Sequence, residues 1–303
     1  MNEHRFDGRV AVVTGAGRGI GRAHALLLAD RGAGVVVNDL GGSMEGVGTD
    51  PEPASYVAGE IVAAGGAAIA DTTDVATAPG AQAVVDAALA QFGRIDILIN
   101  NAGIVRWAGM PEADADNLAS HLTVHVGGSF NTSRAAWPHM VEQGYGRIVM
   151  TTSSGMFGLP DNVSYATAKA AVIGLTRSIA AAGNAHGIKV NLIAPAAWTR
   201  MAGRPADDGE PPGSPQMSPD LVAPMVAFLA HEACPVSGEI YAAGAGRFAR
   251  IFIASTEGYV HDGPEPTIED VADHWATIND ESGYSVPADL PDWSAAFMAH
   301  LRP

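Results

Sequence analysis

A glycine-rich turn between an apolar run and a helical stretch constrains this chain most. Thr14-Gly15-Ala16-Gly17-Arg18-Gly19-Ile20-Gly21 follows the run 10–13 and precedes a helical stretch over 22–30. A buried strand that turns directly into a helix leaves the first helical N–H groups unpaired, and these groups with the helix dipole form a site for a pyrophosphate. Glycine is needed there because a Cβ would block the tight turn and the close approach of the phosphate. We expect Gly15, Arg18, Gly19, Ile20 and Gly21 to contact a dinucleotide.

A second apolar run supports this interpretation, since a Gly-rich turn alone can also close a loop without a ligand. Val35-Val36-Val37-Asn38 ends at Asp39, 18 residues beyond Gly21. A carboxylate at the tip of the second strand accepts hydrogen bonds from the adenosine ribose and repels a 2′-phosphate. Arg18 favours the opposite choice, because an arginine beside the glycines could meet that phosphate. We predict that the cofactor is NAD.

Charge and composition exclude several classes of protein. The 303 residues carry a net charge of −16, which argues against nucleic acid or an anionic membrane as a partner. Neither an apolar segment of about 20 residues nor a secretory signal is visible. The single cysteine, Cys234, is typical of a reducing compartment. We therefore expect a cytoplasmic protein without a membrane span.

Predicted strands and helices alternate along most of the chain. This alternation predicts the α/β class, with a single Rossmann-type, doubly wound parallel sheet. We expect a dinucleotide-binding catalytic domain over 1–246 and a C-terminal extension over 247–303, packed on the core or on a neighbouring subunit. Ligands of such sheets bind beyond the carboxyl ends of the strands. The predicted strand ends gather the turn 15–21 with Asp39, Asp74, Asn101, Ser153 and Pro195.

Some boundaries within this pattern are specific predictions. A helical stretch over 114–143 contains Pro138, where we expect a break or kink. The strand over 188–193 is predicted to close at Pro195, and the strand over 239–242 to be the last.

Tyr165 and Lys169 lie four residues apart, on one face of a predicted helix. An ammonium close to a phenol lowers the phenol pKa from its usual value of about 10, so Tyr165 could act as a base toward an alcohol. A solvated pair with this spacing is common by chance. Ser153 and Ser154, 12 and 11 residues upstream at a strand end, favour the functional interpretation, because one hydroxyl could orient the same substrate oxygen.

With these residues the sequence resembles the short-chain dehydrogenase/reductase family. Five motifs stand in the family's order: the turn 14–21, Asn100-Asn101-Ala102-Gly103, Ser153, Tyr165-x3-Lys169, and Pro195 with Thr199. The resemblance implies that Tyr165 exchanges a proton with the substrate oxygen while hydride passes to or from nicotinamide. It also implies that Ser153 binds that oxygen and that Lys169 binds the nicotinamide ribose and lowers the pKa of Tyr165.

The resemblance also implies further cofactor contacts. Asp74 and Val75 match the positions that hold adenine, and Asn101 would line the ribose pocket. Thr199 would meet the pyrophosphate or the carboxamide. Ala102, Gly103 and Pro195 belong to the same motifs and are expected to contact the cofactor as well.

Two departures from the family pattern concern the catalytic residues. His125 stands where the family usually has an asparagine that keeps a relay water; an imidazole can relay a proton, and packing inside the helix is an equally good interpretation. The Ser–Tyr spacing is more often 13 in the family than the 12 seen here. Ser153 is preferred because it lies three residues past Met150, and Ser154 is the alternative.

Further motifs resemble one group within the family. Arg5-Phe6-Asp7-Gly8-Arg9-Val10, the Asn38-Asp39-Leu40-Gly41-Gly42 segment with its insertion, and Arg134-Ala135-Ala136-Trp137 are similar to the (3R)-hydroxyacyl-CoA dehydrogenase part of peroxisomal multifunctional enzymes of type 2. This resemblance implies NAD-dependent oxidation of a 3-hydroxyacyl-CoA, with a hydroxysteroid or xenobiotic alcohol as the alternative substrate. It also implies a homodimer or homotetramer. A non-catalytic NAD-binding protein is a third hypothesis, which the intact Ser153, Tyr165 and Lys169 disfavour.

The remaining candidates concern the substrate and metals. Trp107 and Met110 could line a substrate pocket or pack in a core or interface. Arg106, Arg200 and Arg204 could meet CoA phosphates, although surface arginines are usually only solvated. We expect no metal site, since the segment 231–234 (His-Glu-Ala-Cys) is not a zinc motif.

Overall fold

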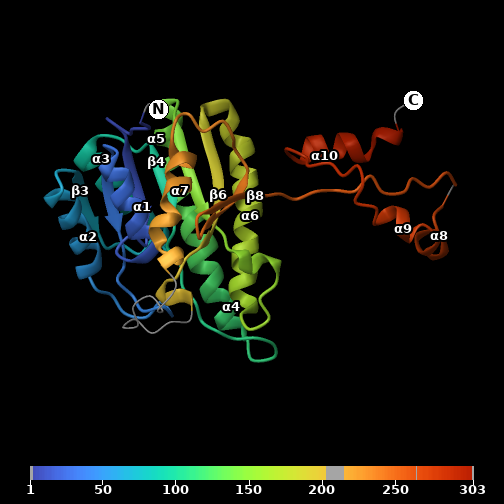
Figure 1. The fold of residues 1–303 in the computed structure, drawn as a ribbon, viewed down its shortest axis with the longest axis horizontal. Helices are drawn as coiled ribbons and strands as arrows, with labels where there is room; N and C mark the ends of the chain where they lie inside the picture. The colour runs from blue at the N-terminus through green and yellow to red at the C-terminus, as the bar shows by residue number, and fades with distance from the viewer. Residues whose placement is uncertain (1–2, 203–214, 264, 302–303) are drawn as a thin grey trace. The chain divides into compact units, whose positions relative to one another are not determined.

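The computed structural model describes residues 3–202, 215–263 and 265–301, in two compact units, Met1–Arg250 and Ile251–Pro303. The first unit is built on an eight-stranded sheet in the order β3-β2-β1-β4-β5-β6-β7-β8 (Figure 1). Its strands are β1 (Val10–Thr14), β2 (Gly34–Asn38), β3 (Ala67–Asp71), β4 (Ile97–Asn100), β5 (Gly146–Thr151), β6 (Ile188–Ala196), β7 (Ile240–Gly244) and β8 (Arg247–Ile251).

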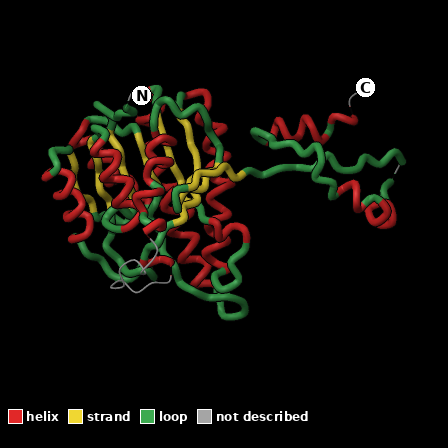
Figure 2. The backbone as a smooth tube through the Cα atoms, in the orientation of Figure 1, coloured by secondary structure: helices red, strands yellow, loops and turns green. Residues whose placement is uncertain are grey.

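The sheet is parallel from β3 to β7, and its register is continuous. Val12 lies opposite Val36 on one side and Leu98 on the other, and Ile148 opposes Leu98 and Val190. The central strands are buried on both faces, which explains why they read as unbroken Val/Ile/Leu runs rather than as alternating patterns. Helices connect successive strands, as parallel pairing requires (Figure 2). The predicted α/β fold with one doubly wound sheet is confirmed.

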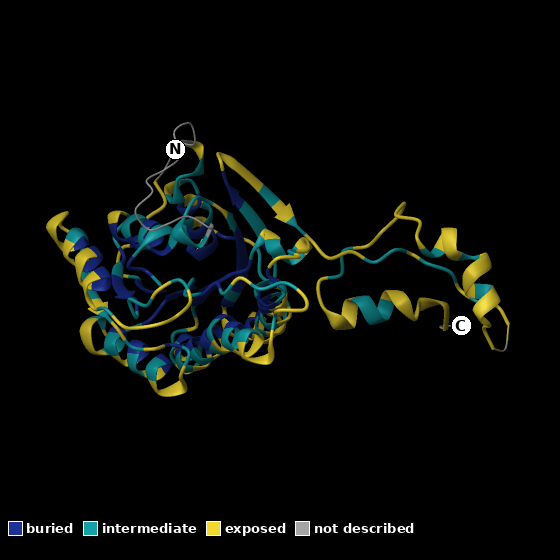
Figure 3. Cartoon of the chain, turned by 90° about the horizontal axis from the view of Figure 1, so that it is seen from below, coloured by how far each residue is buried: buried dark blue, intermediate teal, exposed yellow. Residues whose placement is uncertain are grey.

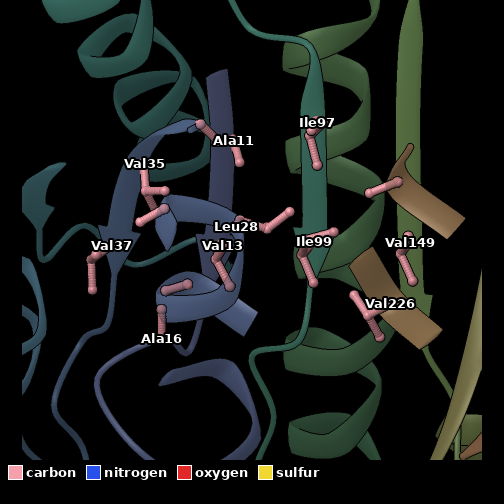
Figure 4. Close-up of a cluster of buried hydrophobic side chains, with 14 of the residues drawn as sticks. Ala11, Val13, Ala16, Leu28, Val35, Val37, Ile97, Ile99, Val149 and Val226 are labelled. Atoms are coloured by element: carbon pink, nitrogen blue, oxygen red, sulfur yellow. The ribbon is translucent and has the colours of Figure 1, made fainter. Parts of the chain in front are cut away.

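Helices cover both faces of this sheet. They are α1 (Gly19–Asp30), α2 (Glu52–Ala63), α3 (Ala78–Phe92), α4 (Ala115–His121), the π-helix η1 (Leu122–Gly128), α5 (Ser129–Gln143), α6 (Val163–Gly183) and α7 (Ala223–Ala230). On one face, Leu28 of α1 and Val226 of α7 pack with Val13, Ile99 and Val149 of the sheet in one buried cluster (Figure 4). Each such fully buried aliphatic side chain contributes about 1.5–3 kcal/mol of transfer free energy, so this cluster holds α1 and α7 against the sheet.

The long helical stretch breaks at a different place from the one predicted. Residues 122–128 form the π-helix η1, whereas Pro138 lies inside α5. Pro138 and Arg134 are both exposed, so water can satisfy the Arg134 carbonyl that the proline leaves without a partner. The break expected at Pro138 is not found, because α5 continues through the proline, and the irregular turn carries His125 instead.

Two strand boundaries also differ from the prediction. Strand β6 continues through Pro195, which lies opposite Ala243 of β7. Its pairing with β5 ends earlier, at Thr151 and Ile193. Pro195 therefore costs no ladder hydrogen bond to β5. Strand β7 is not the last strand, as predicted, because β8 follows it after a two-residue turn of Ala245 and Gly246.

The second unit contains α8 (Ile268–Asp273), α9 (Trp275–Ile278) and α10 (Leu290–Phe297). Local contacts hold it, including a capping box between Thr267 and Asp270 and a ring stack of Tyr259 on His274. None of its described residues is buried (Figure 3). Across the described part of the chain, no helix combines the length and the apolar character needed to cross a bilayer.

Candidate active site

Residues at the carboxyl end of β4 pack against the glycine-rich turn that follows β1. The Asn101 side chain donates from Nδ2 to the carbonyl oxygens of Thr14 (3.0 Å) and Gly15 (3.1 Å). A Cβ at Gly15, where φ is +64°, would lie 2.9 Å from the Ala102 Cα, and a Cβ at Gly21 would collide with the Gly15 carbonyl. The turn has no room for side chains at Gly15 and Gly21, so backbone groups line it there.

Asp39 lies directly beyond β2 and faces this turn. Its carboxylate accepts hydrogen bonds from the N–H groups of Gly17 (2.8 Å) and Gly41 (2.7 Å) and is 8% exposed. It lines a cavity of about 590 Å³ together with Asp74, Val75, Ala102 and Gly103. Arg106 and Arg200 line the same cavity, whereas Arg204 lies outside the described residues. The predicted adenosine residues are thus brought together at one strand edge.

A second cavity of about 260 Å³ brings the turn and the candidate catalytic residues together. Its walls include Ile20, Asn101, Ser153, Ser154, Tyr165, Lys169, Pro195 and Thr199, with Val105, Trp107, Leu159 and Met201 as apolar neighbours. Trp107 is therefore at the cavity, whereas Met110 is 73% exposed and does not line it.

Ser153, Tyr165 and Lys169 are placed by two adjacent element ends. Ser153 follows β5, and its hydroxyl hydrogen-bonds to the phenol of Tyr165. Tyr165 lies in the first turn of α6, where the Asn162 side chain caps the helix by accepting the Tyr165 N–H (3.2 Å). Lys169 lies one turn later; its Nζ donates to the Thr151 carbonyl (2.9 Å) and is 5.6 Å from the Tyr165 ring centre. Ser153 rather than Ser154 thus bonds the phenol.

The electrostatics of this group differ from the sequence-based expectation. Burial raises the pKa of Tyr165, and the hydrogen bond from Ser153 offsets part of that rise. Burial also lowers the pKa of Lys169 to about 7, so the amine is only partly charged at neutral pH. Acidification of Tyr165 by Lys169 is therefore not found in the protein alone, because desolvation acts on both groups.

His125 is buried in η1 beside the phenol. Its Nε2 lies 2.9 Å from the Ile104 carbonyl oxygen and 3.3 Å from the Ile104 N–H, so these contacts suit either tautomer, and among the described residues its Nδ1 has no partner. The ring meets Tyr165 edge-on, with centroids 5.5 Å apart. Burial, and then the positive charge of Lys169, lower the pKa of His125 well below its usual value. His125 is a packed, neutral imidazole whose Nδ1 has no hydrogen-bond partner in the described part of the chain.

Sequence reasoning missed His121, a second fully buried imidazole. Its ring stacks on His125 with centroids 6.0 Å apart, and it meets Tyr165 edge-on at 6.2 Å. Its Nδ1 lies 2.8 Å from the Asn117 carbonyl oxygen, and its Nε2 accepts the Arg106 N–H (3.2 Å). The four-residue spacing from His125, which places both rings on one helix face, is a signal that could have found it.

These residues fit a dinucleotide. The turn excludes side chains where a pyrophosphate would approach, and the acidic residue Asp39 follows β2. The cavity at Asp39 and the cavity at Tyr165 adjoin each other, since Gly103 lines both. A motif of backbone donors at a helix N-terminus with an acid at the second strand is the arrangement that binds dinucleotides in doubly wound sheets.

Comparison with known proteins decides the family. The sequence model described as short chain dehydrogenase matches residues 9–208. The chain belongs to the short-chain dehydrogenase family. Members of this family bind NAD(P), and the chain is accordingly an oxidoreductase that acts on CH–OH groups.

Individual members of the short-chain dehydrogenase family match most of the chain. A putative short-chain type dehydrogenase/reductase of Mycobacterium tuberculosis is 41% identical over 279 residues, covering 92% of this chain and 96% of that protein. Peroxisomal multifunctional enzyme type 2 of Drosophila melanogaster is 42% identical over 285 residues, 92% of this chain. The chain spans only 46% of that enzyme's length. The predicted resemblance to this group is confirmed.

Solved structures of family members agree. The full-length Drosophila enzyme superimposes with a TM-score of 0.80 at 34% identity, over 98% of this chain and 50% of that one. A 7α-hydroxysteroid dehydrogenase complexed with NADH and 7-oxo glycochenodeoxycholic acid superimposes with a TM-score of 0.70 at 31% identity, over 80% of this chain and 95% of that one.

Proposed function

We propose that this protein is an NAD-dependent dehydrogenase that interconverts a secondary alcohol and its ketone, with a 3-hydroxyacyl-CoA as substrate. One observation carries the proposal: the Ser153–Tyr165 hydrogen bond and the Lys169 amine share a cavity with the glycine-rich turn and Thr199. Bound nicotinamide would supply the hydride acceptor or donor at that cavity. The protein supplies the proton transfer and the orientation of the substrate.

The catalytic roles follow from the contacts. Tyr165 would take the proton of the alcohol, and Ser153 would hold the same oxygen by its hydroxyl. Tyr165 would lose its own proton more readily beside a positively charged, oxidised nicotinamide, which offsets the rise in its pKa caused by burial. Lys169 would bind the nicotinamide ribose from its fixed place on Thr151, and Nδ1 of His125 would hydrogen-bond to a relay water.

Cofactor contacts are assigned in the same way. Gly15, Arg18, Gly19, Ile20 and Gly21 would surround the pyrophosphate, and Pro195 and Thr199 the nicotinamide end. Asp74 and Val75 would hold adenine, with Asn101, Ala102 and Gly103 along the ribose. Asp39 supports NAD over NADP, because a buried carboxylate at the ribose repels a 2′-phosphate.

Substrate choice is the finer part of the proposal. The 3-hydroxyacyl-CoA is supported by the similarity to multifunctional enzyme type 2. A hydroxysteroid or similar apolar alcohol is the second candidate, and one observation favours it: the cavity at Tyr165 is walled by Val105, Trp107 and Leu159, whereas Arg106 and Arg200 line the adenosine cavity rather than this one.

We further propose a homodimer in a reducing compartment. A cavity of about 780 Å³ on α5 and α6 is lined by Phe130, Trp137, Leu175 and Ile179, an apolar surface suited to a second copy. The extension predicted over 247–303 begins with β8 of the sheet, and the unit Ile251–Pro303 would pack on the core or on the neighbouring subunit, because a unit without buried residues among its described part cannot stabilise itself. Cys234 is a free, buried thiol, which supports the cytoplasmic location, although several relatives are named as peroxisomal.

The test is Tyr165→Phe, assayed by NADH absorbance with a panel of 3-hydroxyacyl-CoA esters and hydroxysteroids. We expect kcat to fall roughly a hundred- to ten-thousandfold, because the proton acceptor is lost. NAD binding, measured by fluorescence titration, should change by less than about twofold, since the ring remains.

A matched pair of serine variants tests the alignment of the site. Ser153→Ala should lower kcat, whereas Ser154→Ala should leave it nearly unchanged, because only Ser153 bonds Tyr165. Full activity of Tyr165→Phe would contradict the dehydrogenase proposal. Oxidation of steroids but of no acyl-CoA would replace the first substrate with the second.

A further inference from the structure

The loop between β2 and α2 folds back over the glycine-rich turn and brings an acid to Arg18. An Asp50 carboxylate oxygen lies 3.8 Å from an Arg18 guanidinium nitrogen, and both side chains are partly exposed. Asp50 is held in place, because its N–H donates to the Leu40 carbonyl (3.0 Å) and its Oδ1 accepts the Glu52 N–H (2.9 Å). Pro53 packs so closely on Gly17 that a Cβ there would lie 2.6 Å from the proline Cβ.

Arg18 is a cation at a position where it would favour NADP over the proposed NAD. It occupies the N-cap position of α1, directly before Gly19 and one residue after the Gly17 that donates to Asp39. A guanidinium beside an adenosine ribose binds a 2′-phosphate by charge-assisted hydrogen bonds. Among the described residues, the buried Arg18 Nη1 has no hydrogen-bond partner, and Nη2 lies 3.8 Å from Asp50, beyond hydrogen-bond distance, so the guanidinium keeps donors for such a ligand.

We infer that Asp50 is a specificity-determining residue, which neutralises Arg18 and so keeps the 2′-phosphate of NADP from binding beside Asp39. The inference rests on the proposed function, since it assumes that the adenosine lies at Asp39. It adds a second acid to the one that the dinucleotide motif supplies, and this acid comes from the inserted loop rather than from a strand end.

Other charges around this place support the inference. Arg200, which lines the cavity at Asp39, interacts electrostatically with Arg18, Asp39 and Glu45, so Arg18 belongs to the charged groups near that cavity. An ionised Asp50 offsets the positive charge of Arg18, which disfavours a dianionic phosphate at that guanidinium. Removing the charge of Asp50 frees Arg18 to pair with the phosphate.

Asp50→Asn removes the charge and keeps the oxygen that accepts the Glu52 N–H, so the loop can retain its fold. Binding of 2′,5′-ADP and of 5′-AMP to the full chain is measured by calorimetry at low salt. We expect Asp50→Asn to tighten 2′,5′-ADP roughly three- to tenfold, as expected for one partly screened charge facing a dianion. Binding of 5′-AMP should change by less than about twofold, because it has no 2′-phosphate.

A double-mutant cycle assigns the effect to Arg18. In an Arg18→Gln background, Asp50→Asn should no longer tighten 2′,5′-ADP, because the freed cation is absent. Glu52→Gln is the matched control: it removes an acid two residues away and should not change the preference. Added salt should weaken the gain in Asp50→Asn, because the pair and the phosphate are exposed to solvent.

The outcomes separate this inference from the proposed function. Unchanged preference in Asp50→Asn with normal 5′-AMP binding overturns the role of Asp50 alone. An equal gain with and without Arg18, or equal tightening of both nucleotides, also overturns it. Failure of every variant and of the wild type to bind 5′-AMP would overturn the nucleotide site itself, and the inference with it.

Discussion

At the scale of single residues, the buried histidine His24 lowers the stability of the fold at acid pH. His24 of α1 is 1% exposed, and neither ring nitrogen has a partner among the described residues. Burial lowers its pKa from the usual 6.5 to about 3, because an imidazolium would be desolvated. The unfolded chain therefore binds the proton first as the pH falls. The stability that neutral His24 permits is complete above about pH 6.5 and is lost progressively toward pH 3.

Replacing His24 by Leu should remove this dependence. A histidine that stays neutral in the folded protein lowers the unfolding free energy by about 1.4 kcal/mol for each pH unit below the pKa that it has in the unfolded chain. We expect the stability of His24→Leu relative to the wild type to be about 2 kcal/mol more favourable at pH 5 than at pH 8. Urea unfolding at both values measures the difference. His186→Gln, at an exposed histidine, is the control, and parallel pH profiles of wild type and His24→Leu would refute the assignment.

The residues of the site were predictable from sequence, and their electrostatics were not. Spacing placed Ser153, Tyr165 and Lys169 on neighbouring element ends, and the structure brings all three to one cavity. Their pKa directions depend on desolvation, which is a property of the assembled fold, so the expected acidification of Tyr165 is not found in the protein alone. His121 was missed because its contacts with Asn117 and Arg106 exist only once α4 is packed.

At the scale of elements, periodicity predicts where helices and strands lie better than how they are interrupted. A proline is the strongest local signal for a break, yet Pro138 is accommodated on the exposed side of α5. The interruption at η1 places His125 against Tyr165, and π-helical turns often occur at functional sites. Such a turn depends on tertiary contacts of His125 and leaves no mark in the hydrophobic pattern.

The β7–β8 turn carries a strain that a substitution can remove. Ala245 has φ of +51° and is the only non-glycine with positive φ among the described residues; Gly246 follows at +73°. Two positive φ angles in a two-residue loop define a type I′ hairpin turn, for which Asn-Gly is preferred. Ala245→Asn should raise the unfolding free energy by about 0.5–1 kcal/mol. Ala245→Val should lower it, because a β-branched residue tolerates this conformation poorly.

Urea unfolding of both Ala245 variants measures this difference, with far-UV circular dichroism as the signal. The opposite signs provide the internal control, since a general effect of a larger side chain would act in the same direction on both. Equal stabilities of wild type, Ala245→Asn and Ala245→Val would show that the hairpin turn is not formed in solution.

At the scale of the whole molecule, the sequence accounts for the sheet but not for the surfaces left on it. Alternating strands and helices with right-handed crossovers allow few topologies, and the single doubly wound sheet follows. Which helix faces remain apolar depends on the side chains that the fold does not bury. Phe130 of α5 is 48% exposed, at the cavity that it shares with α6. The predicted homodimer needs such a surface, and this one combines aromatic and aliphatic side chains as interface centres do.

Phe130→Asp tests whether a second copy covers this surface. A carboxylate at the centre of an apolar interface would be buried without a partner, so we expect the dimer dissociation constant to rise roughly thirtyfold or more. Sedimentation velocity over a range of concentrations measures it. The folded monomer should be little affected, because Phe130 is already half exposed.

Val62→Asp on α2, at a side chain that is 55% exposed, introduces the same charge outside this surface and should leave the dimer intact. Equal dissociation constants for both variants would exclude the α5–α6 surface, whereas a monomeric wild type would exclude the dimer. A selective effect of Phe130→Asp would mean that the exposed aromatic residue on α5 is retained for assembly rather than for the stability of the single chain.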